Sequence, residues 1–153
     1  MIDKLQDTLD DWGIRHFSAD ESPGLIYLRR WGEYDAPPPD YWERMRPTLQ
    51  IADAGREILG APVLIVSGWR PEEYNKILPG SSPTSEHKEF RALDLRPVDR
   101  DLMEKFRAIM VELVRYARLA GVDARLIHYA GFVHVDVNAA DWKPRQGLDN
   151  RSG

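Results

Sequence analysis

The sequence predicts a small α+β domain in which helices flank a central, antiparallel-leaning sheet. Two segments, 41–59 and 100–119, carry apolar residues at helical spacing and are long enough for full helices. Two β-rich segments, 125–129 and 132–137, are joined at Ala130-Gly131 and indicate a hairpin. At 153 residues with an apolar fraction of 42%, the chain suits a single domain with its own core.

The N-terminal part is expected to form a short helix followed by extended segments. Leu5 and Leu9 lie four residues apart, which predicts a helix over 3–11. Residues 24–31 are rich in β-formers, and the run Pro37 to Pro39 predicts a stiff, extended connection inside the domain.

The helix over 41–59 has clear end signals. Asp40 is a good N-cap, and Gly60 followed by Pro62 ends the helix. The next apolar run, 63–66, is bounded by turn-forming residues and predicts a buried central strand. The expected apolar face of the helix consists of Met45, Leu49, Ala52, Ile58 and Leu59.

The second half of the chain adds short elements and one long helix. We expect a helical turn within 71–78, a loop over 79–83 and a short strand over 92–95. Asp99 should cap the helix over 100–119. We place the core between about residue 17 and residue 142, with a polar tail from Trp142. The expected inward face of the long helix consists of Leu102, Phe106, Ile109, Leu113 and Tyr116.

Composition excludes several classes of function. The net charge is -4 and the two signs are mixed, so no basic face suits nucleic acid. Because the chain has no cysteine, a metal would have to be bound by His, Asp or Glu. No apolar run reaches the length of a membrane span or of a signal peptide, so we expect a chain that starts in the cytoplasm. We also expect a monomer.

Two histidines and an aspartate form the most informative pattern. His87 and Asp94 lie in one segment, and His134 follows some forty residues later. Hydrolytic zinc sites take three such ligands and leave a fourth position for water. Asp94 lies in an apolar stretch, where an unpaired carboxylate is costly. His134 and Asp136 are two apart in a β-rich segment, so both should point to one face.

A structural explanation of the same residues also stands at this point. A single histidine in a strand is commonly a hydrogen-bonded, half-buried residue, and an aspartate after a loop is commonly a cap. Composition and spacing alone leave both explanations open.

The motifs resemble those of the zinc D-Ala-D-Ala carboxypeptidases and peptidoglycan L,D- or D,D-endopeptidases, a peptidase M15-like pattern. That family's signature is S-x-H-x-x-G-x-A-x-D, followed later by H-x-D. The resemblance spans about residues 17 to 142 and implies zinc as the cofactor, with His87, Asp94 and His134 as ligands. The matching stretches are Ser67-Gly68-Trp69-Arg70, Ser85-x-His87, Ala92-x-Asp94 and Phe132-Val133-His134-Val135-Asp136.

The resemblance also implies that Arg70 and Ser85 bind substrate. A guanidinium fork suits a carboxylate, and a hydroxyl can hydrogen-bond the substrate carboxylate or backbone. Arg70 could instead form a surface ion pair with Glu72 or Glu73, and Ser85 could be a turn residue.

Two positions depart from the family signature. Phe90 replaces its glycine, so we expect either a turn that permits a bulky side chain or a phenyl ring that lines the pocket. Gly131 stands where many relatives carry a catalytic carboxylate. We therefore expect Asp136 as first and His128 as second candidate for the general base, with Glu86 third, unless these residues only orient a ligand.

The predicted activity is hydrolysis of peptide bonds in D-amino-acid-containing cell-wall peptides by a zinc-activated water. If Arg70 binds a terminal carboxylate, the enzyme is a carboxypeptidase or dipeptidase, whereas an open groove makes it an endopeptidase of stem peptides. It would act in the cytoplasm or reach the wall by a lysis route, as an endolysin does. Two alternatives are a non-catalytic metal- or peptidoglycan-binding module of the same fold, and a non-haem iron enzyme, which uses two His and one carboxylate.

Overall fold

The computed structural model describes residues 1–20, 24–28, 34–77 and 85–138, so the predicted loop over 79–83 and the polar tail lie outside it. The predicted α+β class is confirmed. No helix in this part of the chain is both long and apolar enough to cross a membrane. The elements are α1 (Ile2–Asp11), β1 (Tyr27–Leu28), β2 (Tyr34–Asp35), η1 (Pro39–Tyr41), α2 (Trp42–Leu59), β3 (Val63–Ser67), α3 (Glu72–Ile77), β4 (Ala92–Pro97), η2 (Arg100–Leu102), α4 (Met103–Leu119), β5 (Ala124–His128) and β6 (Val133–Val137).

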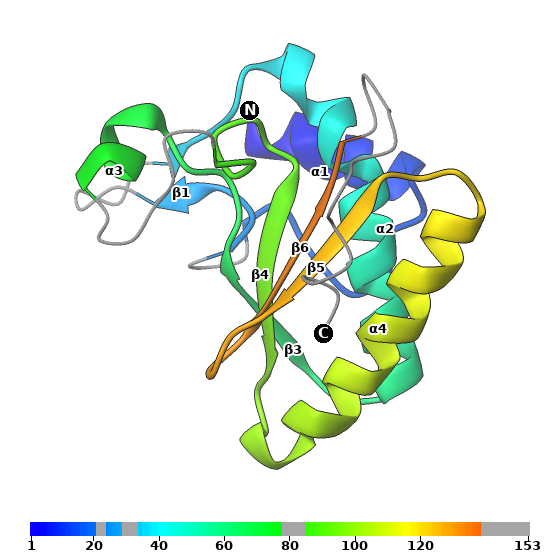
Figure 1. Cartoon of the computed structure of the whole chain (residues 1–153). Coiled ribbons are helices and arrows are strands. Elements are labelled where there is room, and N and C mark those ends of the chain that lie inside the picture. Colours follow the sequence, from blue (N-terminus) through cyan, green and yellow to red (C-terminus); the bar gives the residue numbers. More distant parts are fainter. Residues whose placement is uncertain (21–23, 29–33, 78–84, 139–153) are drawn as a thin grey trace.

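The main sheet has the strand order β3-β4-β6-β5, and every neighbouring pair is antiparallel. β5 and β6 form the predicted hairpin, which Tyr129 closes by donating its backbone N–H to Phe132 O at 3.0 Å. Figure 1 shows α2 and α4 side by side against this sheet, where α2 contacts β4 and β6 and α4 contacts β4 and β5. The helices therefore cover one face of the sheet.

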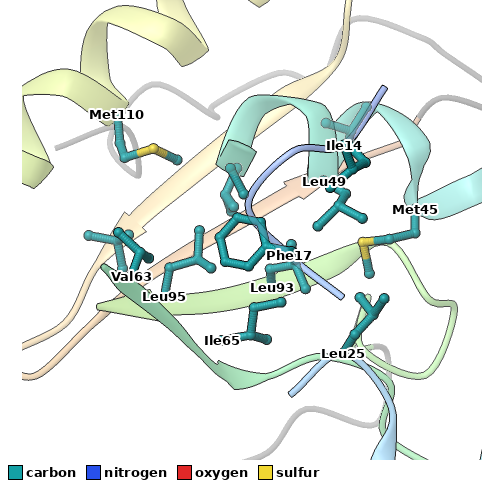
Figure 2. Packing of buried hydrophobic residues seen from close by; sticks show 14 of the residues in the cluster. Ile14, Phe17, Leu25, Met45, Leu49, Val63, Ile65, Leu93, Leu95 and Met110 are labelled. Atoms are coloured by element: carbon teal, nitrogen blue, oxygen red, sulfur yellow. The ribbon is translucent and has the colours of Figure 1, made fainter. Parts of the chain in front are cut away.

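The core fills the space between that face and the helices. Alternate residues of the strands are fully buried there, among them Val133 and Val135. Leu93 and Leu95 belong to the same set (Figure 2). Leu5 and Leu9 of α1 belong to the same core, which therefore begins before residue 17. Because alternation sends one set of strand residues into the core, the intervening residues, Asp94 and His134 among them, face away from the helices.

Two details of the predicted helix faces are wrong. Ile58 is 58% exposed and Tyr116 is 69% exposed, so neither belongs to the core. The buried residues of α4 are Phe106, Met110 and Val114, spaced by four, which turns the inward face slightly from the predicted one. The cause is the helix face and not the helix end, because Leu59, nearer the end of α2 than Ile58, is buried.

The helix starts follow local turn chemistry. Asp40 does not cap α2, because it lies inside the 3-10 turn η1, which Pro38 and Pro39 begin earlier by presetting the backbone angle φ. Asp99 does act as predicted: its carboxylate accepts from Asp101 N at 3.0 Å. The turn that Asp99 caps is η2, and α4 follows from it.

β3 lies at the edge of the sheet, so the predicted central position of the 63–66 run is wrong. The backbone before β1 packs along this edge and helps to cover it. Gly24 N donates to Ile65 O at 3.2 Å, and Trp69 N donates to Leu25 O at 2.7 Å. Of the predicted extended segment 24–31, the structure describes residues 24–28, and Tyr27–Leu28 form the strand β1, which pairs with β2.

Gly68 permits this close approach of two backbones. A Cβ atom on Gly68 would lie 2.4 Å from the carbonyl oxygen of Leu25, nearer than non-bonded atoms approach. Gly68→Ala is therefore expected to lower the free energy of unfolding by about 1–3 kcal/mol, measured by urea denaturation.

The matched control is Gly131→Ala, because a Cβ there would have only Arg100 Nη1 near it, at 4.0 Å. This variant should change stability by less than about 0.5 kcal/mol. Equal losses in the two variants would contradict the packing explanation.

Candidate metal centre

The pairing of β4 with β6 brings two of the predicted ligands together. Asp94 and His134 are directly opposite one another in this antiparallel pair, on the face away from α2 and α4. His87 comes from the turn before β4, and its carbonyl accepts the backbone N–H of Arg70 at 3.1 Å. One potential ligand atom from each of His87, Asp94 and His134 lies within 4.8 Å of the others, and all three residues are buried. The three residues that the sequence singles out thus form one cluster.

The hydrogen bonds of His87 leave one ring nitrogen available to a cation. Its Nδ1 lies 2.8 Å from Gly68 O, and because a carbonyl only accepts, Nδ1 carries the proton. Its Nε2 is buried and makes no hydrogen bond within the described part of the chain, yet lies 3.2 Å from Asp94 Oδ2. The lone pair of Nε2 thus lies next to an Asp94 oxygen, and a metal ion could bind to both atoms.

His134 is held between two carboxylates. Its Nε2 lies 2.7 Å from Asp136 Oδ2, and its Nδ1 lies 2.9 Å from Asp94 Oδ1. Nδ1 is therefore on the side of Asp94 and His87, and donation from Nε2 to Asp136 leaves Nδ1 as the second ligand nitrogen. Two imidazole nitrogens and one carboxylate are a donor set that suits zinc.

The electrostatics of the cluster favour positive charge. Burial alone lowers the pKa of His134, but hydrogen bonds to Asp136 and Asp94 and the charges of both carboxylates outweigh it and raise the pKa to about 9. Burial raises the pKa of Asp94, but the two histidines outweigh it and lower the pKa below its usual value. Asp94 is thus ionised at neutral pH, and a proton and a metal ion compete for His134.

Arg70 lies at the edge of this cluster, and its side chain is largely buried rather than on the surface. Its Nη2 is 3.7 Å from Asp94 Oδ2 and donates to Ser67 Oγ at 3.4 Å. Glu72, one of the expected surface partners of Arg70, lies 3.7 Å from Lys88 Nζ instead. The guanidinium of Arg70 therefore lies beside Asp94, one of the candidate metal ligands.

Ser67 is a site residue that the sequence analysis did not single out. A β-bulge between Ile65 and Ser67 shifts the register of β3 and places Ser67 opposite Asp94. Ser85, by contrast, accepts the backbone N–H of His87 at 3.2 Å, which is the turn role weighed as its alternative. The only sequence signal for Ser67 is its place in the stretch Ser67-Gly68-Trp69-Arg70, which resembles the family.

Asp136 shares the face of His134, as alternation predicts, but it lies behind the imidazole. Its side chain is fully buried, and Oδ2 accepts from Arg125 Nε at 2.9 Å and Nη2 at 2.6 Å. Burial raises the pKa of Asp136, but His134 and Arg125 outweigh it and lower the pKa. Arg125 was also missed, because only the hairpin register, which sets it opposite Asp136, reveals the pair.

The second candidate base, His128, is on the wrong face of the sheet. It pairs with Val133 in the hairpin and lines a hollow of about 490 Å³ beside Glu104 and Arg107 of α4. Burial and the charge of Arg107 lower its pKa. His128 therefore cannot reach the cluster, and the expectation that it acts as a base there is wrong.

Neither departure from the signature places a group in the cluster. Phe90 keeps a left-handed backbone, with φ of 56°, and its ring is fully buried edge-to-face against Trp69. The turn thus retains a conformation that glycine favours, and Phe90 fills the core rather than a pocket.

Glu86, the third candidate for the general base, forms an ion pair with Arg91 at 3.6 Å and does not belong to the ligand cluster.

Comparison with known proteins supplies the family. The family model described as Peptidase M15 matches residues 29–136, well over half of the chain, and its match contains all three residues of the cluster. No curated protein and no solved structure shows significant similarity to the chain. The chain therefore belongs to the peptidase M15 family.

Proposed function

We propose that the protein is a zinc peptidase that cleaves D-amino-acid-containing cell-wall peptides, with His87, Asp94 and His134 as metal ligands. The membership of peptidase M15, a family of metallopeptidases that typically use zinc, supports this proposal. The observation that carries it is the convergence of two imidazole nitrogens, Nε2 of His87 and Nδ1 of His134, on the Asp94 carboxylate. Each imidazole is held from behind by an acceptor, Gly68 O or Asp136, as metal-bound histidines usually are.

The chemistry requires little more than a metal and a positioned substrate. A zinc ion held by these residues would lower the pKa of its water to about 7 and polarise the scissile carbonyl. His87 and His134 fix the direction of the ligand nitrogens, and the Asp94 carboxylate supplies negative charge. Arg70 directs its guanidinium to the same place, where it would bind a carboxylate or the carbonyl oxygen of the substrate.

Asp136 has an orienting role in this proposal and is no longer the first candidate for the base. A general base must come within hydrogen-bond reach of the proton that it takes. Asp136 is 0% exposed, and its Oδ2 is already engaged by His134 and Arg125. Its carboxylate therefore acts through His134 rather than on the substrate.

Metal analysis tests the ligand assignment. Wild-type protein loaded with zinc and then desalted should keep about one zinc per chain. His87→Ala, Asp94→Ala and His134→Ala should each lose most of it, because each removes a ligand, and zinc should no longer raise the melting temperature of these variants. His128→Ala is the matched control, since its imidazole lies on the other face, and it should keep full zinc. Full occupancy in any of the three ligand variants would contradict the ligand assignment, whereas iron bound by protein purified without added metal would contradict the choice of zinc.

Arg70→Lys tests whether the substrate offers a free terminal carboxylate. Lysine keeps the charge but loses the two-pronged contact, worth about 1.5 kcal/mol for a charge-assisted hydrogen bond. The KM for a peptide ending in a free carboxylate should then rise about tenfold, while the KM for its amidated counterpart should hardly change. Equal changes for the two peptides would favour an endopeptidase over a carboxypeptidase.

Asp136→Asn separates orientation from proton transfer. An orienting Asp136 predicts that zinc affinity weakens about 10- to 100-fold, while kcat at saturating zinc stays close to wild type. Normal zinc affinity together with a fall in kcat of about 10²- to 10⁴-fold would instead restore Asp136 as the base.

A further inference from the structure

Arg125 forms the outermost contact of a chain of side chains that ends at the candidate metal centre. It lies directly opposite Asp136 in the β5–β6 hairpin. Its Nε and Nη2 donate to Asp136 Oδ2 at 2.9 and 2.6 Å, and the same oxygen accepts from His134 Nε2 at 2.7 Å. The Arg125 side chain is itself only 15% exposed.

The N–H donors of Arg125 and His134 restrict the rotation of the Asp136 carboxylate. Three N–H groups point at Oδ2 of Asp136, whereas the buried Oδ1 has no hydrogen-bond partner among the residues that the structure describes. A carboxylate bound only to His134 could rotate and present either oxygen. The rigid fork of Arg125 removes that freedom, because its two donors must stay in the guanidinium plane.

We propose that Arg125 is a positioning residue for the metal ligand His134. By holding Oδ2 of Asp136 against Nε2, Arg125 keeps the imidazole turned so that Nδ1 faces His87 and Asp94. The inference rests on the proposed function, since it presupposes that His134 binds metal through Nδ1. It adds that a residue outside the ligand cluster controls how tightly the metal is held.

A purely structural ion pair would give a different result from a positioning residue. Removing Arg125 leaves a buried carboxylate without its cation, and this lowers stability in either case. Only a positioning role predicts that zinc affinity changes through Asp136 and that the proton on His134 is less firmly placed. Zinc affinity and the ring proton are therefore the informative measurements.

The test compares Arg125→Met, Arg125→Lys and Asp136→Asn with the double variant Arg125→Met/Asp136→Asn. The zinc dissociation constant is measured by competition with a chelator. Arg125→Met should weaken binding about 10- to 100-fold, and Arg125→Lys should recover part of the loss. The double variant, which removes both buried charges and so guards against misfolding of Arg125→Met, should bind zinc no more weakly than Asp136→Asn alone.

Long-range ¹H–¹⁵N NMR spectra of the zinc-loaded proteins supply the second readout. Wild type should show the His134 proton on Nε2 and no proton on Nδ1, whereas Arg125→Met should broaden or split these signals. Arg115→Met is the control, because Arg115 is 64% exposed in its side chain and pairs with Glu112 on α4. It should leave both readouts unchanged.

The outcomes separate the two proposals. Wild-type protein that binds no zinc would overturn the proposed function and this inference together. Zinc bound equally tightly by wild type and Arg125→Met would overturn this inference alone. Additive losses in the double variant would do the same, because Arg125 would then act independently of Asp136.

Discussion

The candidate metal centre depends on the antiparallel register between β4 and β6. This register sets Asp94 opposite His134, and the two-residue period of a strand then places Asp136 beside His134 on the same face. A slip of β6 by one residue would turn His134 and Asp136 toward the core beneath α2 and α4 and turn Val135 out of it. The burial of the apolar set therefore also fixes the position of the ligands.

The rest of the molecule supports this register from two sides. The α2–α4 layer covers the apolar face, with Gly55 of α2 so close to α4 that a Cβ would lie 2.6 Å from the sulfur of Met110. At the other end of the sheet, Gly68 serves two purposes. Its lack of a side chain lets the backbone of Leu25 cover β3, and its carbonyl holds the imidazole of His87. The same short loop thus contributes to folding and to the geometry of the site.

Much of the fold can be predicted from the sequence, because the spacing of apolar residues indicates the helices and strands. The two long helices and the hairpin could be predicted in this way, whereas the grouping of His87, Asp94 and His134 was implied by the resemblance to the zinc peptidases. What could not be predicted depends on cross-strand register or on a single bulge. The Arg125–Asp136 pair, the place of Ser67 opposite Asp94 and the position of His128 on the helical face all belong to this class. Phe90 shows a third limit, since a bulky residue in a left-handed turn is uncommon and becomes understandable only once its ring is seen in the core.

The central claim is that His87, Asp94 and His134 hold one zinc ion through Nε2, a carboxylate oxygen and Nδ1 respectively. A crystal structure of zinc-loaded protein, with diffraction data collected on both sides of the zinc absorption edge, measures this directly. The account predicts one anomalous peak at about 2.0–2.2 Å from those three atoms, with Nε2 of His134 still bonded to Asp136. An anomalous peak elsewhere, or a zinc ion bound through Nε2 of His134, would contradict it.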